Sequence, residues 1–441
     1  MADSHRVVIL GGGFGGLYAA QRLKHAPVQV TVIDRRNFHL FQPLLYQVAT
    51  GALSPGEISA PIRGILAKQK NTRVLLGETS DIDPDAKRVT LKDGAQVSYD
   101  TLIVATGSQS SYFGNNHWKD WAPPLKTVED ATTIRHKILL AFEAAERVHD
   151  PVERQAWLTF VIVGAGATGV ELAGSLGEIA NETLKHDFRS IRPQDARIIV
   201  VDGAPRTLMA YPEDLSRKAE TQLIRLGVRI RCGVKVVGVD AAGVAIQTSK
   251  GEHEHIPSRT VIWAAGVAVS DFGRVLAERT HAETDRGGRI KVGPDLTIPS
   301  HPDIFVVGDL AYSVGEEDKP LPGVAQVAMQ GGVYAAKAIV ARLKGQRIAP
   351  FKYFNKGDMA VIGRGAAVAN TFGLHLSGLP AWLAWLFIHL LYLVEFQSRI
   401  VVLVQWGFLY LSHSRSALLI TGHAASDIVL RKEPLKNTVD D

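Results

Sequence analysis

Residues 7–16 read Val-Val-Ile-Leu-Gly-Gly-Gly-Phe-Gly-Gly and decide the fold of the chain. Four apolar residues precede the glycines, and helix-forming residues follow from Leu17 to Leu23. A strand, a tight turn and a helix in this order begin a βαβ unit, the building block of a parallel sheet. The spacing of Gly11, Gly13 and Gly16 also lets the backbone approach a pyrophosphate, which would bind at the positive end of the helix.

An acidic residue supports this interpretation. Asp34 ends the next apolar strand, Val28–Ile33, and lies 23 positions after Gly11. At about 20 positions from the first glycine, a carboxylate accepts a hydrogen bond from a ribose hydroxyl of the dinucleotide. A glycine-rich turn beside a solvated aspartate is the alternative, and the two flanking strands count against it. Residues 7–34 therefore predict a dinucleotide-binding site.

The same pattern occurs a second time along the chain. Residues 160–169 read Phe-Val-Ile-Val-Gly-Ala-Gly-Ala-Thr-Gly, and a later echo pairs residues 102–107 with residues 261–266. Two Rossmann-like dinucleotide-binding domains, the second inserted in the first, explain this repeat. Loop composition predicts one domain of residues 1–120 with 300–365, a second of residues 121–299, and a C-terminal segment of residues 366–441.

The second copy has its own candidate acid. Asp202 ends the strand Arg197–Val201, 38 positions after Gly164, and a longer helix and charged loop account for the excess. An acid here favours NADH over NADPH, because a carboxylate accepts a hydrogen bond from the 2′-hydroxyl and repels a 2′-phosphate. Arg206 follows closely, and an arginine near this position leaves binding of NADPH open.

Two further stretches suit a flavin. Gly308-Asp309 ends a third buried strand, where the aspartate suits the ribityl chain of a flavin; an aspartate that merely ends a strand is the alternative. A helix then begins at Ala325 and places Gln326 and Gln330 on one face, one turn apart. The N-terminus of such a helix stabilises negative charge on a reduced flavin. Two glutamines on a helix are otherwise an ordinary polar face.

Three stretches resemble a known family, the type II (non-proton-pumping) NADH:quinone oxidoreductases. Residues 37–46 read Asn-Phe-His-Leu-Phe-Gln-Pro-Leu-Leu-Tyr, residues 325–330 read Ala-Gln-Val-Ala-Met-Gln, and residues 356–364 read Lys-Gly-Asp-Met-Ala-Val-Ile-Gly-Arg. The resemblance covers nearly the whole chain and implies the α/β fold of glutathione-reductase-like flavoproteins. It implies FAD in the first domain, NADH in the second, and a quinone that reaches the flavin from the membrane side.

The resemblance also assigns roles to residues. Glu171 matches a glutamate near the nicotinamide and the flavin, and Gln326 and Gln330 match glutamines of the quinone site, so these three are the expected catalytic residues. Arg399 matches a basic residue that approaches the flavin from the C-terminal segment. Asp202 stands where many members carry glutamate, which keeps the preference for NADH. The expected cofactor-binding residues are Gly11, Gly12, Gly13, Phe14, Gly15, Gly16, Asp34, Arg35, Ala105, Thr106, Gly107, Gly164, Gly166, Gly169, Asp202, Ala265, Gly266, Gly308, Asp309, Ala325, Gln326 and Arg399.

Composition excludes several other classes. The chain has 441 residues, 46% of them hydrophobic and 21% charged, which is typical of a globular protein. A net charge of +5 does not by itself argue for nucleic acid, and no nucleic acid is expected as a partner. The first residues lack the pattern of a signal peptide. Cys232 is the only cysteine, which excludes a disulfide framework, a cysteine-rich zinc site and a redox-active pair. No metal is expected, and electrons must leave the flavin without a protein thiol.

Two apolar runs occur near the end of the chain. Leu379–Val394 has 16 residues and Ile400–Leu411 has 12, and both are shorter than the ~20 residues that span a bilayer. Charged residues lie between them, which also disfavours spanning. We expect these runs to lie in the membrane interface, with aromatic side chains at the headgroup boundary and two basic residues following: Trp382, Trp385, Trp406, Tyr410, His413 and Arg415. A buried core helix or a dimer interface is the alternative.

These features together predict an FAD-dependent NADH:quinone oxidoreductase that is peripheral (monotopic) on the cytoplasmic face of the bacterial inner membrane. The expected partners are NADH, a quinone (ubiquinone or menaquinone), membrane lipids and a second copy of the chain in a homodimer. A soluble NADH-dependent reductase of a redox protein, such as a ferredoxin or rubredoxin reductase, shares the fold and is the alternative function. A non-enzymatic flavoprotein with a redox-sensing or scaffold role is a third class.

Overall fold

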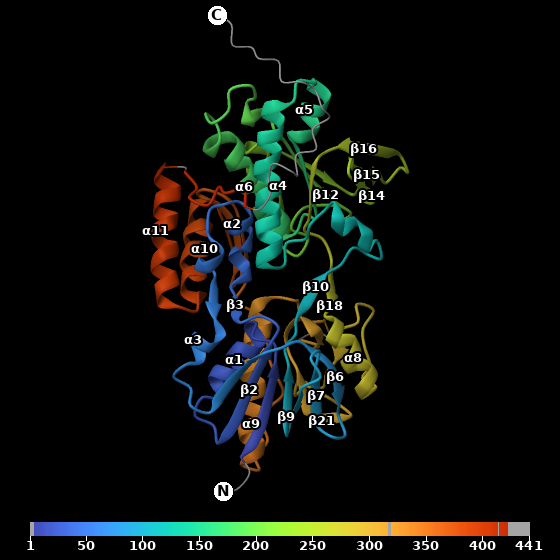
Figure 1. Cartoon of the computed structure of the whole chain (residues 1–441), viewed down its shortest axis with the longest axis vertical. Coiled ribbons are helices and arrows are strands. Elements are labelled where there is room, and N and C mark those ends of the chain that lie inside the picture. Colours follow the sequence, from blue (N-terminus) through green and yellow to red (C-terminus); the bar gives the residue numbers. More distant parts are fainter. Residues whose placement is uncertain (1–3, 316–318, 413, 422–441) are drawn as a thin grey trace, which may run out of the picture. The chain divides into compact units, whose positions relative to one another are not determined.

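The computed structural model describes residues 4–315, 319–412 and 414–421 (Figure 1). The chain divides into two compact units. Unit 1 contains the residues up to Phe41, Ser59–Ser111 and Val267–Lys356. Unit 2 contains Gln42–Ile58, Tyr112–Gly266 and the residues from Gly357 onward. Both units have mixed α/β architecture, as the repeat in the sequence predicts.

Unit 1 is built on a six-stranded sheet with the order β20-β21-β9-β1-β2-β5. The strands from β21 to β5 pair in parallel, and β20 pairs antiparallel with β21. Residues 7–10 of the central strand β1 are buried. Burial on both faces of a parallel sheet explains why these four residues are all apolar. The bounds are β1 (His5–Leu10), β2 (Val28–Asp34), β5 (Thr72–Leu76), β9 (Thr101–Val104), β20 (Thr297–Ile298) and β21 (His301–Val306).

Smaller elements cover this sheet. One face packs against a three-stranded antiparallel sheet and helix α8, with Val8, Leu102 and Ile304 in the shared core. Helices α1 and α9 pack against one another. The bounds are α1 (Phe14–Arg22), α3 (Ile62–Leu66), α8 (Asp271–Thr280), α9 (Ala325–Leu343), β3 (Phe38–Leu40), β4 (Ser59–Pro61), β6 (Thr79–Asp83), β7 (Arg88–Leu91), β8 (Gln96–Ser98), β10 (Ser108–Ser110), β18 (Val267–Val269), β19 (Ile290–Lys291) and β22 (Ala311–Tyr312).

Unit 2 repeats the theme with a four-stranded parallel sheet in the order β13-β12-β11-β17. All five residues of β11 are buried, as expected for the centre of a parallel sheet. Helix α4 begins with a capping box in which the Thr127 hydroxyl accepts from the Asp130 N–H. The bounds are α4 (Val128–Arg147), α5 (Pro151–Trp157), α6 (Ala167–Glu178), α7 (Glu213–Arg225), β11 (Thr159–Val163), β12 (Arg197–Asp202), β13 (Val228–Cys232), β14 (Lys235–Asp240), β15 (Gly243–Gln247), β16 (His253–Pro257) and β17 (Thr260–Trp263).

The last part of unit 2 is a second antiparallel sheet followed by two apolar helices. The strands are β23 (Asp358–Gly363), β24 (Ala366–Thr371) and β25 (Leu374–Ser377). Helices α10 (Leu379–Tyr392) and α11 (Phe396–Ser412) lie side by side in Figure 1 and contact each other. Within the described ranges, no helix is both long enough and apolar enough to cross a membrane.

The compact units differ from the expected domains in several places. Residues 112–120 belong to unit 2, and so does the C-terminal segment that begins at residue 366. Residues 267–299 belong to unit 1, where β18 pairs with β10. Residues 42–58 belong to unit 2, because α2 (Leu45–Ala49) packs on α4 and α6. Residues 357–365 also belong to unit 2, where β23 lies so close to α6 that a Cβ on Gly174 would meet the Ile362 carbonyl oxygen at 1.7 Å. Such packing between distant segments leaves no signal in loop composition.

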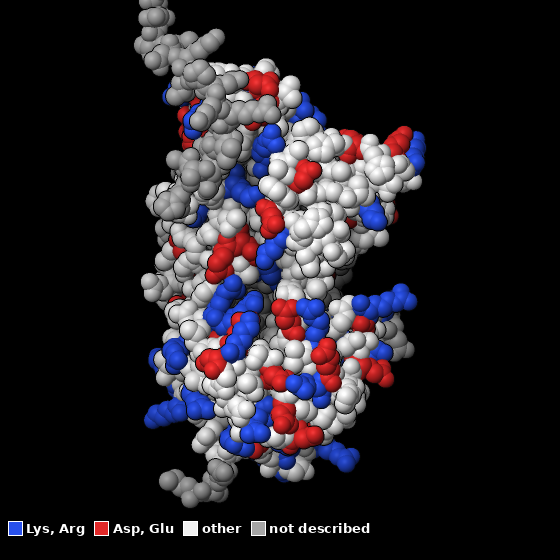
Figure 2. Space-filling model, turned by 45° about the vertical axis from the view of Figure 1, so that its right-hand side comes forward, with Lys and Arg blue, Asp and Glu red and all other residues white. Residues whose placement is uncertain are grey.

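Charged side chains are mixed over the face shown in Figure 2. Lys and Arg lie among Asp and Glu there, and no large patch of one sign dominates that face. Within unit 1, oppositely charged side chains form ion pairs such as Arg6–Asp100 and Arg279–Asp81.

Candidate functional site

The first glycine turn of unit 1 is shaped for close approach of a ligand. Gly11 has φ +97°, and a Cβ at this position would lie 2.4 Å from the Ala105 carbonyl oxygen, so only glycine fits. A Cβ on Gly13 would meet no atom within 4 Å. Helix α1 starts directly after Gly13, and no side chain caps its N-terminus. This arrangement fits the pyrophosphate of a dinucleotide.

Asp34, the acid predicted for this turn, lies beside it and stabilises its backbone through two hydrogen bonds. Asp34 Oδ2 accepts a 2.6 Å hydrogen bond from the Gly12 N–H, and Oδ1 accepts from the Arg36 N–H at 2.7 Å. The sequence pattern predicts a contact with ribose and does not reveal this second task.

His39 is a residue of the same turn that the sequence reasoning did not single out. Its Nδ1 lies 2.9 Å from the Gly12 carbonyl oxygen, and its buried Nε2 has no hydrogen-bond partner among the described residues. Burial lowers the pKa of His39, so the ring stays neutral. A buried polar atom without a partner beside a glycine turn is consistent with a ligand group there.

Unit 1 brings three of the expected cofactor-binding segments to the same sheet edge. Gly11, Ala105 and Gly308 follow the carboxyl ends of β1, β9 and β21, which are neighbouring parallel strands. Asp309 Oδ2 accepts a 2.6 Å hydrogen bond from the Ser108 hydroxyl. Segments 11–16, 105–107 and 308–309 therefore lie at one edge of the sheet.

Unit 2 repeats the turn with the same geometry. Gly164 has φ +113°, and a Cβ on Gly166 would meet no atom within 4 Å at the uncapped start of α6. Asp202 Oδ2 accepts from the Ala165 N–H at 2.6 Å, and Oδ1 accepts from the Ala204 N–H at 2.7 Å. A π-helical turn (Ile179–Thr183) extends α6, which accounts for part of the long spacing between glycine and acid.

Arg206, the residue that left NADPH open, is engaged inside the protein. Its guanidinium donates to the carbonyl oxygens of Leu208, Met209 and Tyr211 at 2.9–3.2 Å, and to the Ser216 hydroxyl. These contacts use the guanidinium to brace the loop after β12. This arrangement favours NADH.

Glu171 lies on α6, five residues after Gly166. The residue keeps some exposed surface, but its carboxyl is surrounded by protein, and this desolvation raises the pKa of Glu171 to about 8. A weak 3.4 Å hydrogen bond from the Val361 N–H to Oε1 acts in the opposite direction. Burial is the larger of the two effects, so the net shift is upward.

The two glutamines of α9 share a face, as predicted, and both contact one backbone segment. Gln330 exchanges two 2.9 Å hydrogen bonds with the backbone of Phe354. Gln326 Oε1 accepts from the Lys356 N–H at 3.2 Å. Arg399 folds back on the connection between α10 and α11, where its Nε donates to the Leu393 carbonyl oxygen at 2.8 Å.

The aromatic and basic residues of the C-terminal segment correct one expectation. Trp385 and Trp406 are almost completely buried in unit 2, so the expectation that these two lie at the headgroup boundary is wrong. Arg415 is also buried. Helix periodicity explains the error, because each of the two helices has an inner face as well as an outer one. His413 lies outside the described residues.

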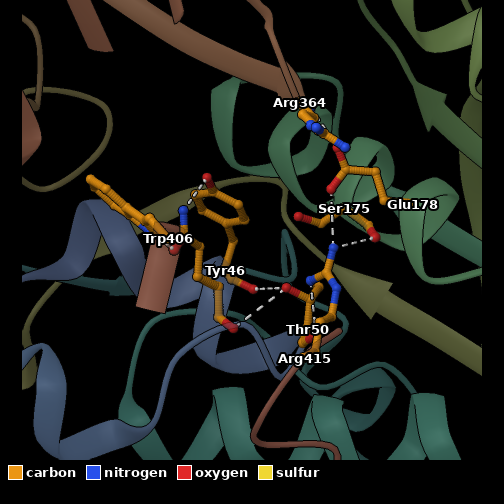
Figure 3. Close-up of polar contacts among 8 residues, drawn as sticks. Tyr46, Thr50, Ser175, Glu178, Arg364, Trp406 and Arg415 are labelled. Carbon is orange, nitrogen blue, oxygen red and sulfur yellow. Dashed lines mark hydrogen bonds and ion pairs between the residues drawn. The ribbon is translucent and has the colours of Figure 1, made fainter. Parts of the chain in front are cut away.

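A buried polar cluster around Arg415 was not predicted (Figure 3). Its guanidinium donates to the Thr50 carbonyl oxygen at 3.0 Å and the Ser175 carbonyl oxygen at 3.3 Å, and it lies 3.1 Å from Glu178 Oε2. On the adjacent side of α2, Trp406 Nε1 donates to Gln47 Oε1 at 2.7 Å. The partners are more than 200 positions apart in sequence, so no local pattern could have revealed them.

The environment of Cys232 does not favour a reactive thiolate. Burial raises the pKa of its thiol to about 11, so the thiol is not ionised near neutral pH.

Comparison with known proteins agrees with this geometry. Residues 5–332 match the family model of pyridine nucleotide-disulphide oxidoreductases. Two relatives from Mycobacterium tuberculosis (strain ATCC 25618 / H37Rv), the type II NADH:quinone oxidoreductases Ndh and NdhA, are each 48% identical to this chain. The alignments cover 96% and 95% of this chain and 91% and 89% of the relatives. The structure of NDH2 from Plasmodium falciparum in complex with NADH has the same fold, with a TM-score of 0.85, 21% identity, and coverage of 95% of this chain and 100% of that one.

Proposed function

This chain belongs to the pyridine nucleotide-disulphide oxidoreductases and, within them, to the type II NADH:quinone oxidoreductases, and we propose the following roles for its residues. The enzyme oxidises NADH through bound FAD and passes two electrons to quinone without pumping protons. The flavin, when bound, supplies the chemistry that accepts a hydride from NADH and returns two electrons to quinone. The observation that carries the assignment is the duplicated turn, in which an uncapped helix start and a bracing aspartate occur once in each unit.

Unit 1 residues hold FAD in this proposal. The N–H groups at the start of α1 bind the pyrophosphate, and Asp34 accepts from the ribose while it braces Gly12. The segments 105–107 and 308–309 and the start of α9 hold the flavin end. FAD is thus assigned to unit 1 and NADH to unit 2, with the bounds of the compact units in place of the bounds expected from loop composition.

Unit 2 residues select the nucleotide. The start of α6 binds the pyrophosphate of NADH, and Asp202 accepts from the 2′-hydroxyl of the ribose. Arg206 is engaged with backbone carbonyl groups, so it does not serve as a cation for a 2′-phosphate.

Glu171 holds a proton at its carboxyl group near neutral pH. With a pKa of about 8, the carboxyl is mostly protonated at pH 7 and can donate that proton when quinone is reduced. Gln326 and Gln330 bind the quinone from α9, and Arg399 is the basic residue that approaches the flavin from the C-terminal segment.

The outer faces of α10 and α11 attach the enzyme to the membrane in this proposal. Large apolar side chains stay exposed there at helical spacing, namely Leu383, Phe387, Leu391, Ile400, Leu403, Val404, Phe408 and Leu411. An apolar face of this kind lies in the interface of a bilayer without spanning it. We place it on the cytoplasmic face of the bacterial inner membrane, and a homodimer through part of the same surface is compatible with this placement.

Steady-state oxidation of NADH by the purified protein tests the function. We expect rapid turnover with a short-chain quinone and slow turnover with a ferredoxin or rubredoxin. Turnover with a soluble redox protein that exceeds turnover with quinone would assign the enzyme to the reductases instead.

A further inference from the structure

Unit 2 contains a cavity of about 300 Å³ to which the proposed reaction assigns no role. This volume lies at the lower end of the range for small-molecule sites, about 300 to 1,000 Å³. The walls come from the end of α6 with its π-helical turn, from α7, from the turn between β23 and β24, and from the end of α11. All of these elements belong to unit 2.

The charged residues of this cavity leave a positive excess. Three arginines and two glutamates line it. The buried Arg415 guanidinium pairs with the Glu178 carboxylate at 3.1 Å, so these two charges compensate each other. The other charged lining residues, Arg225, Arg364 and Glu182, have a net charge of +1. A ligand that carries one negative charge therefore fits the cavity.

Arg225 is well placed to bind that negative charge. It lies in the last turn of α7, and its side chain is exposed. Among the described residues, the side chain has no hydrogen bond or ion pair. The planar guanidinium donates two parallel hydrogen bonds, which match two oxygens of a phosphate group.

The same wall presents acceptors that need a donor. Gln222 lies three residues before Arg225, so the two side chains share a face of α7. Gln222 Oε1 is buried and has no hydrogen-bond partner among the described residues. Glu182, on the π-helical turn, adds an exposed carboxylate. A ligand that fits must therefore bring hydrogen-bond donors together with its negative charge.

The cavity adjoins the apolar surface of α10 and α11. Leu409 of α11 lines the cavity, and Phe408 and Leu411 beside it in the sequence are exposed. The start of α10 lies against the turn between β23 and β24, since a Cβ on Gly365 would lie 3.9 Å from Cδ1 of the exposed Leu379. A polar cavity and an apolar surface are thus neighbours, as the headgroup and the acyl chains are in a lipid.

We propose that this cavity binds the headgroup of an anionic phosphoglycerol lipid, whose acyl chains lie along the outer faces of α10 and α11. The phosphodiester binds Arg225, and the glycerol hydroxyl groups donate to Gln222 Oε1 and to the Glu182 carboxylate. This inference rests on the proposed attachment of α10 and α11 to the membrane, and it names the lipid class that the attached enzyme prefers.

Other ligands with a phosphate group match the cavity less well. A phosphocholine headgroup has no N–H or O–H donor, so Gln222 Oε1 would stay without a partner. A phosphoethanolamine headgroup has donors, but it has no net charge to compensate the positive excess. A free phosphate would leave the neighbouring apolar side chains in water. A phosphoglycerol headgroup combines the negative charge, the hydroxyl donors and the acyl chains.

Vesicles that differ in headgroup at constant charge test the site. One set contains phosphatidylcholine with phosphatidylglycerol, and the other contains the same fraction of phosphatidylmethanol, which carries the same phosphodiester charge but no hydroxyl group. Because the surface charge is equal, general electrostatic attraction is the same for both sets. We expect the FAD-loaded wild-type enzyme to bind the phosphatidylglycerol vesicles about fivefold more tightly, as one or two hydrogen bonds provide.

Two variants remove the two halves of the site. Gln222→Met keeps the size of the side chain and removes the acceptor, so it should bind both sets of vesicles equally. Arg225→Gln removes the phosphate contact and should weaken binding to phosphatidylglycerol vesicles about fivefold. Arg217→Gln is the matched control, because Arg217 is exposed on the same helix and does not line the cavity. It should keep the wild-type preference. FAD content and thermal melting verify that each protein is folded.

A second readout does not depend on membrane attachment. Dihexanoyl phosphatidylglycerol, used below its micellar concentration, should raise the melting temperature of the wild type and of Arg217→Gln but not of Arg225→Gln. Dihexanoyl phosphatidylmethanol should raise it much less. An unchanged melting temperature of the wild type, or an equal rise with both lipids, overturns the headgroup site even if vesicles bind. Binding of the monomeric lipid without binding of vesicles overturns the attachment through α10 and α11 instead.

Two further ligands test the choice of lipid by the same melting measurement. Glycerol phosphate and dihexanoyl phosphatidylethanolamine should each stabilise the wild type less than dihexanoyl phosphatidylglycerol does. Equal stabilisation by glycerol phosphate would assign the cavity to a free phosphate and overturn the lipid. Stronger stabilisation by the ethanolamine lipid would overturn the anionic headgroup.

Discussion

The Asp202 carboxylate accepts a 2.6 Å hydrogen bond from the Ala165 N–H, which ties the acid at the end of β12 to the glycine turn that starts α6. Asp34 makes the same contact with Gly12 in unit 1. Each acid therefore shapes a turn in addition to the ribose contact proposed for it, and a substitution at either position should affect both.

Nucleotide preference gives the first prediction. Asp202→Ala should raise the KM for NADH about tenfold and reduce the preference for NADH over NADPH. The variant loses the hydrogen bond from the Ala165 N–H and the carboxylate that repels a 2′-phosphate. The measurement is kcat/KM with each nucleotide. Asp240→Ala, at the exposed end of β14, is the control and should change neither value. Equal use of both nucleotides by the wild-type enzyme would contradict the assignment of Asp202.

Glu171 predicts how quinone reduction depends on pH. With a pKa of about 8, its carboxyl group is protonated below pH 8 and ionised above it, so the quinone half-reaction should slow as pH rises through 8. Glu171→Gln should reduce turnover about tenfold or more and abolish this inflection. Stopped-flow reoxidation of the flavin from pH 6 to pH 9 measures both. A variant that keeps the wild-type profile would leave Glu171 without a role in proton transfer.

The raised pKa of Glu171 also predicts how the stability of the protein depends on pH. The pKa of Glu171 is higher in the folded protein than its ordinary value of 4.5, so the folded state binds this proton more tightly. The contribution to stability is complete below pH 4.5 and is lost as pH rises through 8. Melting temperatures should therefore fall more steeply between pH 5 and pH 9 for the wild type than for Glu171→Gln. Parallel curves for the two proteins would show that the carboxyl group is not desolvated.

Removal of the Arg415 side chain should destabilise the protein strongly. Arg415→Ala removes the cation beside the Glu178 carboxylate and the donor to two carbonyl groups, which should cost about 3 kcal/mol. The double variant Arg415→Met with Glu178→Met should recover much of this loss, because no unpaired charge remains. Arg274→Ala breaks an exposed pair and should cost less than about 1 kcal/mol. Denaturant unfolding measures all three, and equal losses for Arg415→Ala and Arg274→Ala would contradict the account.

Membrane attachment is tested by substitution and not by truncation, because Trp385, Trp406 and Arg415 are part of the core of unit 2. Changing Phe387, Phe408 and Leu411 to Gln together should release the enzyme from lipid vesicles, since each apolar side chain contributes about 1.5 kcal/mol when buried. A control with Leu76, Val152 and Val267 changed to Gln should still sediment with vesicles. Unchanged binding of the first variant would exclude this face as the anchor.

The glycine turns and their acids could be predicted because their signal is local. Gly11 and Asp34 belong to one strand-turn-helix-strand unit, and the second unit repeats it with Gly164 and Asp202. Parallel strands then bring segments 105–107 and 308–309 to the same edge, so the topology follows from the repeat.

The cluster around Arg415 could not be predicted, because its contacts join residues 237 to 365 positions apart. Hydropathy predicted the apolar runs of α10 and α11, but α11 begins at Phe396 and includes the residues expected as a polar break. It did not show which aromatic residues face inward, since a short apolar helix shows little difference between its faces. The packing of residues 42–58 on α4 and α6 was missed for the same reason: it is a contact between distant segments.

The most direct test of the central claim is a double-mixing stopped-flow experiment under anaerobic conditions. One equivalent of NADH is mixed with the FAD-loaded enzyme, and a short-chain quinone is added once the flavin absorbance has bleached. We expect complete bleaching by NADH and full recovery of the absorbance with one equivalent of quinone. Bleaching by NADH without recovery on addition of quinone would contradict it.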